Sequence, residues 1–338
     1  MDRQLPASTD VLIVGGGLAG AAAARALTDA GRRCLVLDKG RGPGGRLSTR
    51  RIDGAGFDHG AACLQAVGDE FRVWLDAEVR AGRMAVWEQA WVGVPGMDAV
   101  VAGLLDGLDV RWSLSVAAVC RREGLWAALA ADGRPLAEAP ALLLAVPAPQ
   151  ALALLSAGLE AGPGMATLTG LGELIEALHR VRFAPCWAGL IVVDETAAPL
   201  ASGSRSVADG VLAAVFREAD KPGRAKAGHW VVQATEAWSQ THLELDAERV
   251  APLLRAAFVG ASGVPDAAVR SVVAHRWRYA RPLSGIADGG AAAQAGLMLA
   301  GDAIGHVDDA AMPPAERAWR SGREAAARLL ALGVQPKS

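Results

Sequence analysis

Short apolar runs near both ends of the chain predict the buried strands of a parallel sheet. Four runs are almost wholly apolar: residues 11–14, 34–37, 141–146 and 297–300. A parallel strand that is covered on both faces has such a continuous run instead of an alternating pattern. The alanine-rich residues 18–30 lie between the first two runs and favour a helix that ends before Gly31. The N-terminal residues therefore predict one complete βαβ unit.

The rest of the chain predicts further elements of both kinds. Helices are expected over residues 69–82, 97–107, 247–259 and 315–332. Strands are expected over residues 84–94, 109–131, 187–193, 211–217 and 229–235. Residues 40–62 are rich in Gly and Arg and are expected to form a loop. Residues 139–159 carry no charge, but three prolines interrupt them, so a strand, a turn and a helix are expected there instead of a membrane span.

Composition and charge exclude several classes of protein. The chain has 338 residues, of which 52% are hydrophobic and 21% charged, which is typical of a globular protein. A net charge of −2 provides no basic excess for nucleic acid or an anionic membrane. Four cysteines without a CxxC pair and six histidines without metal-ligand spacing predict a reduced, cytoplasmic protein with no metal site. The apolar residues 11–24 have no positively charged flank, which argues against a signal peptide.

Gly15, Gly17 and Gly20 fit the GxGxxG pattern of a dinucleotide-binding turn. The pattern follows a predicted strand and opens a predicted helix, and Asp38 ends the next strand. In such a turn Gly15 permits the tight bend, Gly17 lets the backbone approach a pyrophosphate, and Gly20 allows close helix–strand packing. Asp38 is placed to accept hydrogen bonds from an adenosine ribose, and it would repel the 2′-phosphate of NADP. NAD and FAD share this pattern, so it leaves both open.

Three further segments favour FAD, because they resemble segments of amine-oxidase-type flavoproteins. The first is Gly44-Gly45-Arg46, in which the arginine of such proteins meets the phosphate or the flavin side of the cofactor. The second is residues 57–61, with the sequence FDHGA, which resembles the segment beside the isoalloxazine ring. The third is Gly301-Asp302 after an apolar strand, whose carboxylate is expected near the ribityl or pyrophosphate group. The helix from about residue 315 would then point its positive N-terminus at the flavin.

Over nearly its whole length the chain resembles a renalase-type FAD-dependent oxidoreductase of the flavin-containing amine oxidase superfamily. Additional strings that carry the resemblance are residues 185–188 (PCWA), 230–239 (WVVQATEAWS) and 275–282 (HRWRYARP). The resemblance implies a flavoprotein that oxidises a dihydronicotinamide by hydride transfer to flavin N5, with molecular oxygen as electron acceptor. It implies that FAD contacts Gly15, Gly17, Leu18, Ala19, Gly20, Asp38, Lys39, Gly45, Arg46, His59, Gly60, Ala61, Val116, Gly301 and Asp302. No cysteine follows Cys186, so we expect the FAD to be bound non-covalently.

The predicted fold class is α/β, with a Rossmann-type FAD-binding domain and an inserted α+β substrate domain. The FAD-binding domain is expected to comprise residues 1–83, 97–160 and 280–338. The substrate domain is expected to comprise residues 84–96 and 161–279.

The segment before and within the C-terminal helix departs from the resemblance. Arg317 stands where the related proteins have a glycine close to the flavin, and residues 307–314 are extra. An arginine there is able to hold a carboxylate or phosphate by two parallel hydrogen bonds. No residue is assigned to the chemical step itself, and the candidates for lining the pocket are His59, Trp187, Trp277, Tyr279 and Arg317.

Two other functions stay open at this point. One is a flavin amine or amino-acid oxidase, which would need an aromatic wall beside the flavin; ten tryptophans and one tyrosine are available for it. The other is an FAD-binding protein without turnover, acting as a scaffold or sensor, and the altered residues 303–317 motivate it. Reduction of the bound flavin by a panel of reductants separates these functions.

Overall fold

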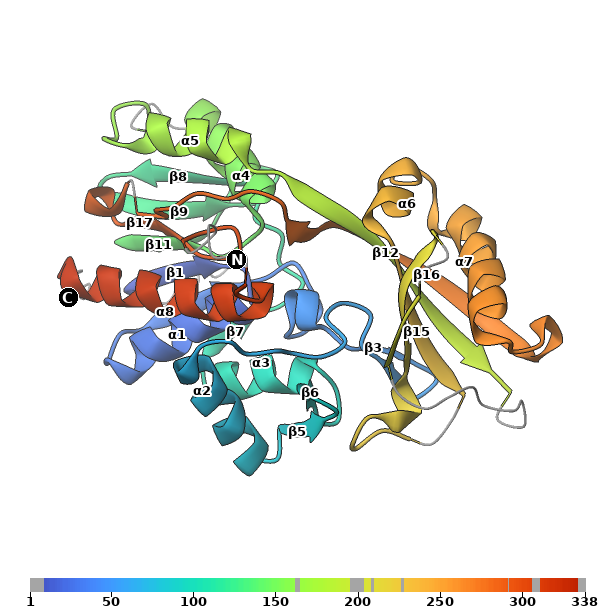
Figure 1. The fold of residues 1–338 in the computed structure, drawn as a ribbon. Helices are drawn as coiled ribbons and strands as arrows, with labels where there is room; N and C mark the ends of the chain where they lie inside the picture. The colour runs from blue at the N-terminus through green and yellow to red at the C-terminus, as the bar shows by residue number, and fades with distance from the viewer. Residues whose placement is uncertain are drawn as a thin grey trace, which may run out of the picture.

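The computed structural model describes residues 9–161, 165–194, 204–207, 210–225, 228–290, 292–305 and 311–333. They form two lobes, each built around one five-stranded sheet (Figure 1). Two long strands, β12 (Phe183–Val193) and β16 (Val269–Pro282), run from one lobe into the other. The two lobes therefore meet along a junction that strands cross twice.

The first lobe contains the parallel sheet that the sequence predicts. Its strand order is β17-β11-β1-β2-β7, and every neighbouring pair is parallel. The strands are β1 (Val11–Val14), β2 (Cys34–Leu37), β7 (Asp109–Arg111), β11 (Ala141–Leu144) and β17 (Leu297–Leu299). All residues of β1 and β11 are buried, which explains their continuous apolar runs. The structure thus confirms the predicted α/β class.

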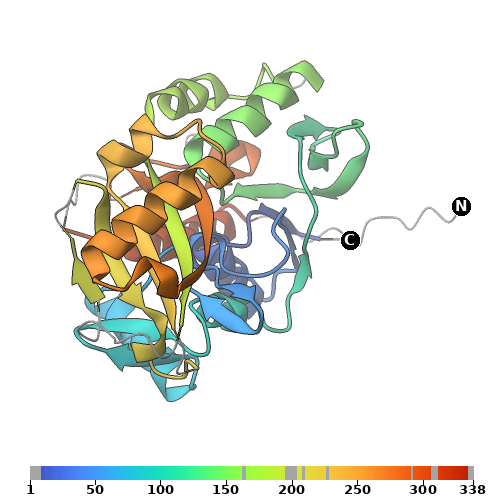
Figure 2. The ribbon, with the colours of Figure 1, turned by 90° about the vertical axis from the view of Figure 1, so that its right-hand side faces the viewer.

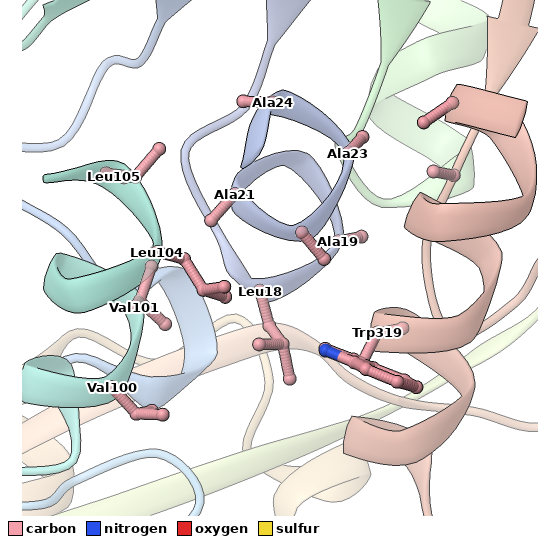
Figure 3. Packing of buried hydrophobic residues seen from close by; sticks show 14 of the residues in the cluster. Leu18, Ala19, Ala21, Ala23, Ala24, Val100, Val101, Leu104, Leu105 and Trp319 are labelled. Atoms are coloured by element: carbon pink, nitrogen blue, oxygen red, sulfur yellow. The ribbon is translucent and has the colours of Figure 1, made fainter. Parts of the chain in front are cut away.

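Helices cover one face of this sheet. They are α1 (Leu18–Asp29), α2 (Asp69–Arg80), α3 (Asp98–Leu105) and α8 (Pro314–Ala331). Figure 3 shows α1 between α3 and α8, with the Leu18 side chain next to the ring of Trp319. A side chain on Gly322 would meet the backbone oxygen of Ala19 at 2.2 Å, so the glycine lets α8 pack closely against α1. This contact brings the N-terminal halves of the two helices together.

A three-stranded antiparallel sheet and two helices cover the opposite face. The sheet order is β10-β9-β8, and the elements are β8 (Ala118–Arg122), β9 (Leu125–Leu129), β10 (Pro135–Ala139), α4 (Ala148–Ala161) and α5 (Leu171–Arg180). Leu171, Leu174 and Leu178 of α5 share one hydrophobic cluster with Leu142 of the parallel sheet. Residues 171–180 thus pack with the first lobe, although the sequence places them in the substrate domain.

The second lobe is an antiparallel sheet with one long helix across it. The strand order is β13-β14-β15-β12-β16. The remaining elements are β13 (Ser204–Ser206), β14 (Leu212–Arg217), η2 (Glu218–Asp220), β15 (His229–Ala234), α6 (Glu236–Thr241), α7 (Ala247–Ser262) and η3 (Asp266–Ala268). Figure 2 shows α7 lying across this sheet, and its residues Val250, Leu254 and Phe258 enter the core with Ile191. The inserted unit is therefore α+β, as the sequence predicts.

Residues 40–62, expected as a loop, contain a short 3₁₀ helix and a hairpin. The elements are η1 (Gly45–Leu47), β3 (Arg50–Ile52) and β4 (Ala55–Phe57). Ala55 and Phe57 pack against Leu190 and Val231 on the face of the second sheet that α7 does not cover. This segment of the first lobe thus reaches across to the second lobe.

Several expected boundaries differ from those observed. Residues 84–94, expected as one strand, form a hairpin of β5 (Met84–Trp87) and β6 (Ala90–Gly93) that turns at Glu88 with φ +55°. The buried side chains Met84, Trp87 and Val92 belong to the core around α1, not to the core under α7. Packing thus places the hairpin with the first lobe, although the sequence places residues 84–96 in the substrate domain. A last short element, η4 (Ala293–Ala295), precedes β17.

Candidate functional site

The three glycines of the βα turn have different surroundings. Gly15 has φ +112°, and a Cβ there would lie 2.4 Å from the backbone oxygen of Ala145. A Cβ on Gly20 would lie 1.9 Å from the backbone oxygen of Gly15. A Cβ on Gly17 would have only the Cα of Gly45 within 4 Å, at 3.9 Å. Gly15 and Gly20 are thus required by the protein's own packing, while Gly17 faces open space.

The N-terminus of α1 opens toward this space. No side chain caps the helix at Gly17, and its first turn carries no acidic residue. The first amides of a helix lack partners within the helix and carry partial positive charge. The amides of Leu18 and Ala19 are thus available to an anion, such as the pyrophosphate of a dinucleotide.

Asp38 follows β2 and is held by the backbone around it. Its Oδ2 accepts a hydrogen bond from the Gly16 amide, and its Oδ1 accepts one from the Gly40 amide, both at 2.6 Å. Each carboxylate oxygen can accept a second hydrogen bond, so the group can still bind a ribose hydroxyl. Lys39 is exposed, and Val116 is half-buried in the segment between β7 and β8.

The second glycine pair lies directly beside the first turn. Gly44 forms an isolated parallel bridge with Gly17, and a Cβ on Gly45 would lie 3.2 Å from the Cα of Gly17. Gly44 and Gly45 both have positive φ, +123° and +56°. These three glycines thus bring two backbone segments into contact at the edge of the open space, which suits a phosphate-bearing ligand that must approach the backbone closely.

Arg46 and Asp302, both expected to contact the cofactor, contact each other. Arg46 Nη1 and Nη2 donate to the two carboxylate oxygens of Asp302, each at 2.6 Å. Arg46 Nη1 also donates to the backbone oxygen of Ala280 at 3.1 Å, where β16 ends. The pair joins the loop after β17 to η1, and its bidentate geometry fixes both groups. In this structure Arg46 therefore orients Asp302 instead of standing free for a phosphate.

The segment of His59, Gly60 and Ala61 packs against this pair. The Ala61 amide donates to the backbone oxygen of Arg46 at 2.9 Å, and a Cβ on Gly60 would meet the same oxygen at 2.0 Å. From the other side, Gln233 Nε2 donates to the Gly60 oxygen at 2.6 Å. Only a glycine fits at position 60, and the segment lies between the two lobes.

His59, His275 and Trp277 form one aromatic cluster at the junction. The ring centroids of His59 and His275 lie 4.6 Å apart, and those of His275 and Trp277 lie 4.5 Å apart. Trp277 Nε1 donates to the backbone oxygen of His59 at 2.8 Å. His59 is 5% exposed, and its Nδ1 has no hydrogen-bond partner. A buried polar atom without a partner points to a bound group.

Both histidines of this cluster are neutral at physiological pH. Burial lowers the pKa of His59. Burial lowers the pKa of His275 to about 4, and repulsion from Arg50 and from His59 when it is protonated adds to this shift. The cluster therefore presents uncharged rings and no imidazolium. His275 was not selected from the sequence, because only the folded chain brings its ring beside that of His59.

The two other aromatic candidates have different surroundings. Trp187 pairs directly with Arg276 across β12 and β16, whereas Trp277 pairs with Cys186, so the two tryptophans point to opposite faces of the sheet. Trp187 is buried in the core under α7. The ring of Tyr279 contacts that of Phe183, with the centroids 5.7 Å apart. The structure thus brings Trp277 to His59 and places Trp187 away from them.

Arg317 lies in the first turn of α8 and is buried. It is 9% exposed, and its Nε makes no hydrogen bond. No carboxylate in the part of the chain that the structure describes forms an ion pair with it. Its neighbour Glu316 is fully committed, because it accepts hydrogen bonds from the amides of Val67 and Gly68 and from Arg320 Nε. Residues 306–310 of the divergent segment lie outside the described residues.

A buried network of four charges lies next to His59. Lys221 Nζ donates to Asp58 Oδ2 at 3.0 Å and to Glu218 Oε1 at 2.6 Å, and Arg224 also pairs with Asp58. The Asp58 pKa is lowered, because Lys221 and Arg224 outweigh its burial, whereas burial raises the pKa of Glu218. The sequence analysis did not predict this network. Two residues could have indicated it: Asp58, which lies in the FDHGA segment, and Lys221, which is one of only four lysines.

The described residues contain neither a candidate membrane span nor a candidate metal site. No helix among them is both long and apolar enough to span a bilayer. No group of three His, Cys, Asp or Glu side chains among them is arranged to hold a metal ion.

Comparisons with known proteins support the fold. The model of the NAD(P)-binding Rossmann-like domain family matches residues 13–77. A protein assigned as a protoporphyrinogen oxidase from Exiguobacterium has a TM-score of 0.66 at 14% identity, covering 96% of this chain and 100% of that one. Putrescine oxidase bound to putrescine has a TM-score of 0.60 at 16% identity, covering 96% and 99%. The chain therefore shares its fold with these two oxidases, which agrees with the predicted fold class. The renalase-type resemblance stays a prediction.

Curated relatives match smaller parts of the chain. The tRNA 5-methylaminomethyl-2-thiouridine biosynthesis bifunctional protein MnmC of Ralstonia nicotianae is 25% identical over 274 residues, which cover 62% of this chain and 42% of that protein. Polyamine oxidase 4 of Oryza sativa is 39% identical over 70 residues, 21% of this chain and 14% of that protein. The chain thus spans less than half the length of these relatives. A fatty acid isomerase from P. acnes also shares the fold, with a TM-score of 0.62, 11% identity and coverage of 95% and 98%.

Proposed function

We propose that this protein is an FAD-dependent oxidoreductase that binds its cofactor non-covalently. The observation that carries the proposal is the open space at Gly17, bounded by the uncapped N-terminus of α1 and the second glycine pair. A Rossmann turn of this kind has no structural need for an unsubstituted Gly17, since a Cβ there would meet nothing closer than 3.9 Å. A pyrophosphate at the helix amides supplies the reason.

Further residues would hold the rest of the cofactor. Asp38 has acceptor capacity for the adenosine ribose. Val116 lies two residues after Leu114, whose amide donates to the backbone oxygen of Asp38. Asp302, fixed by Arg46, would act at the ribityl or pyrophosphate group. His59 offers an unpartnered Nδ1 at the junction of the lobes. These residues fit FAD better than NAD, because they extend from the first βα turn to the second lobe.

We further propose a dihydronicotinamide as substrate and molecular oxygen as the final electron acceptor. Bound FAD would supply the hydride acceptor and pass the electrons to oxygen, giving hydrogen peroxide. The chain's part in such a reaction is to position the substrate ring and exclude water. Trp277 and the neutral rings of His59 and His275 provide an aromatic wall without a charged acid or base.

A flavin amine oxidase is the second candidate. The names of the relatives polyamine oxidase and putrescine oxidase favour it. The same aromatic wall would then face an amine, and the low pKa of His275 would keep that residue from repelling a cationic substrate. A flavin-binding scaffold without turnover is the third, and only kinetics separates it from the two enzymes.

Spectroscopy of the purified protein tests these functions. We expect a yellow protein with about one FAD per chain, released into the supernatant by acid precipitation. Under anaerobic conditions, reduced nicotinamides and their isomers, putrescine and spermidine are each mixed with the protein, and flavin bleaching is timed. A nicotinamide that bleaches the flavin at least about 100-fold faster than either amine supports the proposal; the reverse order supports the amine oxidase. Slow bleaching by every reductant supports the flavin-binding scaffold without turnover. A colourless protein that takes up no FAD refutes all three functions.

A further inference from the structure

The indole ring of Trp112 lies against the glycine turn that follows β1. Trp112 comes directly after β7, and its side chain is half-buried. A Cβ on Gly16 would lie 2.9 Å from Cζ3 and 3.0 Å from Cη2 of this ring, and 3.4 Å from the Cβ of Asp38. Position 16 therefore has no room for a side chain, because the outer edge of the indole already lies there, close to Asp38.

The indole reaches past the end of one strand. In the parallel sheet β2 lies between β1 and β7, and neighbouring strands are about 4.8 Å apart. Trp112 starts from the end of β7, yet its ring meets Gly16 after β1. The ring therefore passes the carboxyl end of β2, which Asp38 follows. Open parallel sheets bind their ligands at this carboxyl edge.

The backbone after Trp112 holds the ring in this place. The amide of Ser113 donates to the backbone oxygen of Gly40 at 2.7 Å, and that of Leu114 donates to the backbone oxygen of Asp38 at 2.9 Å. Ser113 has φ +57°, a left-handed value that is uncommon for residues other than glycine. The chain thus turns sharply after Trp112 and is tied to the loop that follows β2. Backbone conformations of this kind cluster at ligand sites.

The order of the strands matches the order of the groups in a dinucleotide. The proposed place of the pyrophosphate is the uncapped N-terminus of α1, which follows β1. The proposed place of the ribose is Asp38, which follows β2. The base comes next along the molecule, and β7 comes next along the sheet. Trp112 is the aromatic side chain at the end of that strand.

We propose that Trp112 binds the adenine base of the dinucleotide by stacking against it. The inference rests on the proposed function, because FAD supplies the base. Part of the indole packs on the core of the first lobe, and its exposed part is left for the base. Stacking of a base on an aromatic side chain removes both faces from water and needs no matching hydrogen bonds. Trp112 thus adds affinity for an aromatic base, while Asp38 recognises the sugar.

ADP-ribose tests this contact, because it carries the adenosine diphosphate of FAD without the flavin. Calorimetry measures the affinities of ADP-ribose and FAD for the full chain freed of flavin. The variants are Trp112→Phe, Trp112→Leu and Trp238→Leu; Trp238 is a half-buried tryptophan of α6 in the second lobe and is the matched control. We expect Trp112→Leu to bind both ligands about 10–100-fold more weakly, Trp112→Phe less than about fivefold more weakly, and Trp238→Leu as wild type does.

Absorbance separates stacking from a purely structural role of the indole. A base that is stacked on an aromatic ring absorbs less in its ultraviolet band than the free base. Bound ADP-ribose should show this loss of absorbance with wild type and with Trp238→Leu, and should not show it with Trp112→Leu. If wild type binds ADP-ribose without the loss, the indole only covers Gly16 and the proposal is overturned, even where Trp112→Leu does not fold.

The other outcomes distinguish this inference from the proposed function. If Trp112→Leu binds ADP-ribose and FAD as tightly as wild type, the stacking contact is refuted, and the proposed function is untouched. If ADP-ribose stacks on Trp112 but the protein takes up no FAD, the adenine site stands and the proposed function fails.

Discussion

A side chain at Gly17 would test the proposed pyrophosphate site at the N-terminus of α1 without disturbing the protein around it. Its backbone is extended, with φ −79° and ψ −174°, which any residue adopts. The nearest atom to an added Cβ is the Cα of Gly45, at 3.9 Å. Replacing an N-cap glycine by an apolar residue costs about 1 kcal/mol or less. Gly17→Val should therefore lower the free energy of unfolding of the flavin-free protein by no more than that.

The same substitution should largely abolish FAD binding. The valine methyl groups would occupy the space in front of the amides of Leu18 and Ala19, where we propose that the pyrophosphate lies. Two hydrogen bonds to a charged group, at roughly 1.5–3 kcal/mol each, total about 3–6 kcal/mol. This corresponds to a loss of about 10²–10⁴-fold in affinity. Titration of the flavin-free protein with FAD, followed by quenching of flavin fluorescence, measures the loss, and urea unfolding measures stability.

Two other glycines serve as controls. A Cβ on Gly20 would lie 1.9 Å from the Gly15 oxygen, so Gly20→Ala should lose stability before any effect on binding is measured. Gly172 lies in α5 with nothing within 4 Å of its added Cβ, so Gly172→Ala should keep both stability and FAD affinity. If Gly17→Val binds FAD as tightly as wild type, the pyrophosphate does not lie at Gly17. If it is as unstable as Gly20→Ala, the space in front of Gly17 is not open.

Two predictions concern the junction of the lobes. Lys221→Met should lower the free energy of unfolding by about 3 kcal/mol, because it leaves Glu218 and Asp58 buried with one fewer cation. Chemical denaturation measures this loss, and a loss below about 1 kcal/mol would contradict the prediction. The pKa of His275 is about 4 in the folded protein and 6.5 in the unfolded chain. The folded protein therefore loses stability as the pH falls from about 6.5 to 4, because the unfolded chain binds a proton at His275 first. His275→Asn should therefore lose less stability than wild type between pH 7 and pH 4.5, and parallel losses would exclude the assignment.

Local sequence signals predicted the first lobe best. The strands β1, β2, β11 and β17 are short runs buried on both faces, so their composition alone identifies them. The hairpin of β3 and β4 was missed, because its sequence is rich in Gly and Arg and its order comes from packing against Leu190 and Val231. The hairpin at residues 84–93 was read as one strand, because the turn at Glu88 contains no Gly or Pro. Tertiary contacts decide such segments, and a single sequence does not contain them.

The residues of the candidate site likewise differ in how far the sequence could predict them. Gly15, Gly17, Gly20 and Asp38 lie within 24 consecutive residues, and their pattern carries its own structural context. The partner of Arg46 lies 256 residues away, and Trp277 meets a backbone oxygen 218 residues away. No spacing rule relates residues so distant, so His275 and the Arg46–Asp302 pair could be found only in the folded chain. The same holds for Trp187, whose face of the sheet is set by its register with Arg276.

The contacts between the lobes show where selectivity would arise. Trp277 and Gln233 of the second sheet both donate to backbone oxygens of residues 59 and 60, while residues 60 and 61 pack on Arg46. The proposed pyrophosphate site thus belongs to the first lobe. The aromatic wall exists only where the second sheet packs against the first lobe. A change in β16 can therefore alter the wall while leaving the glycine turn intact.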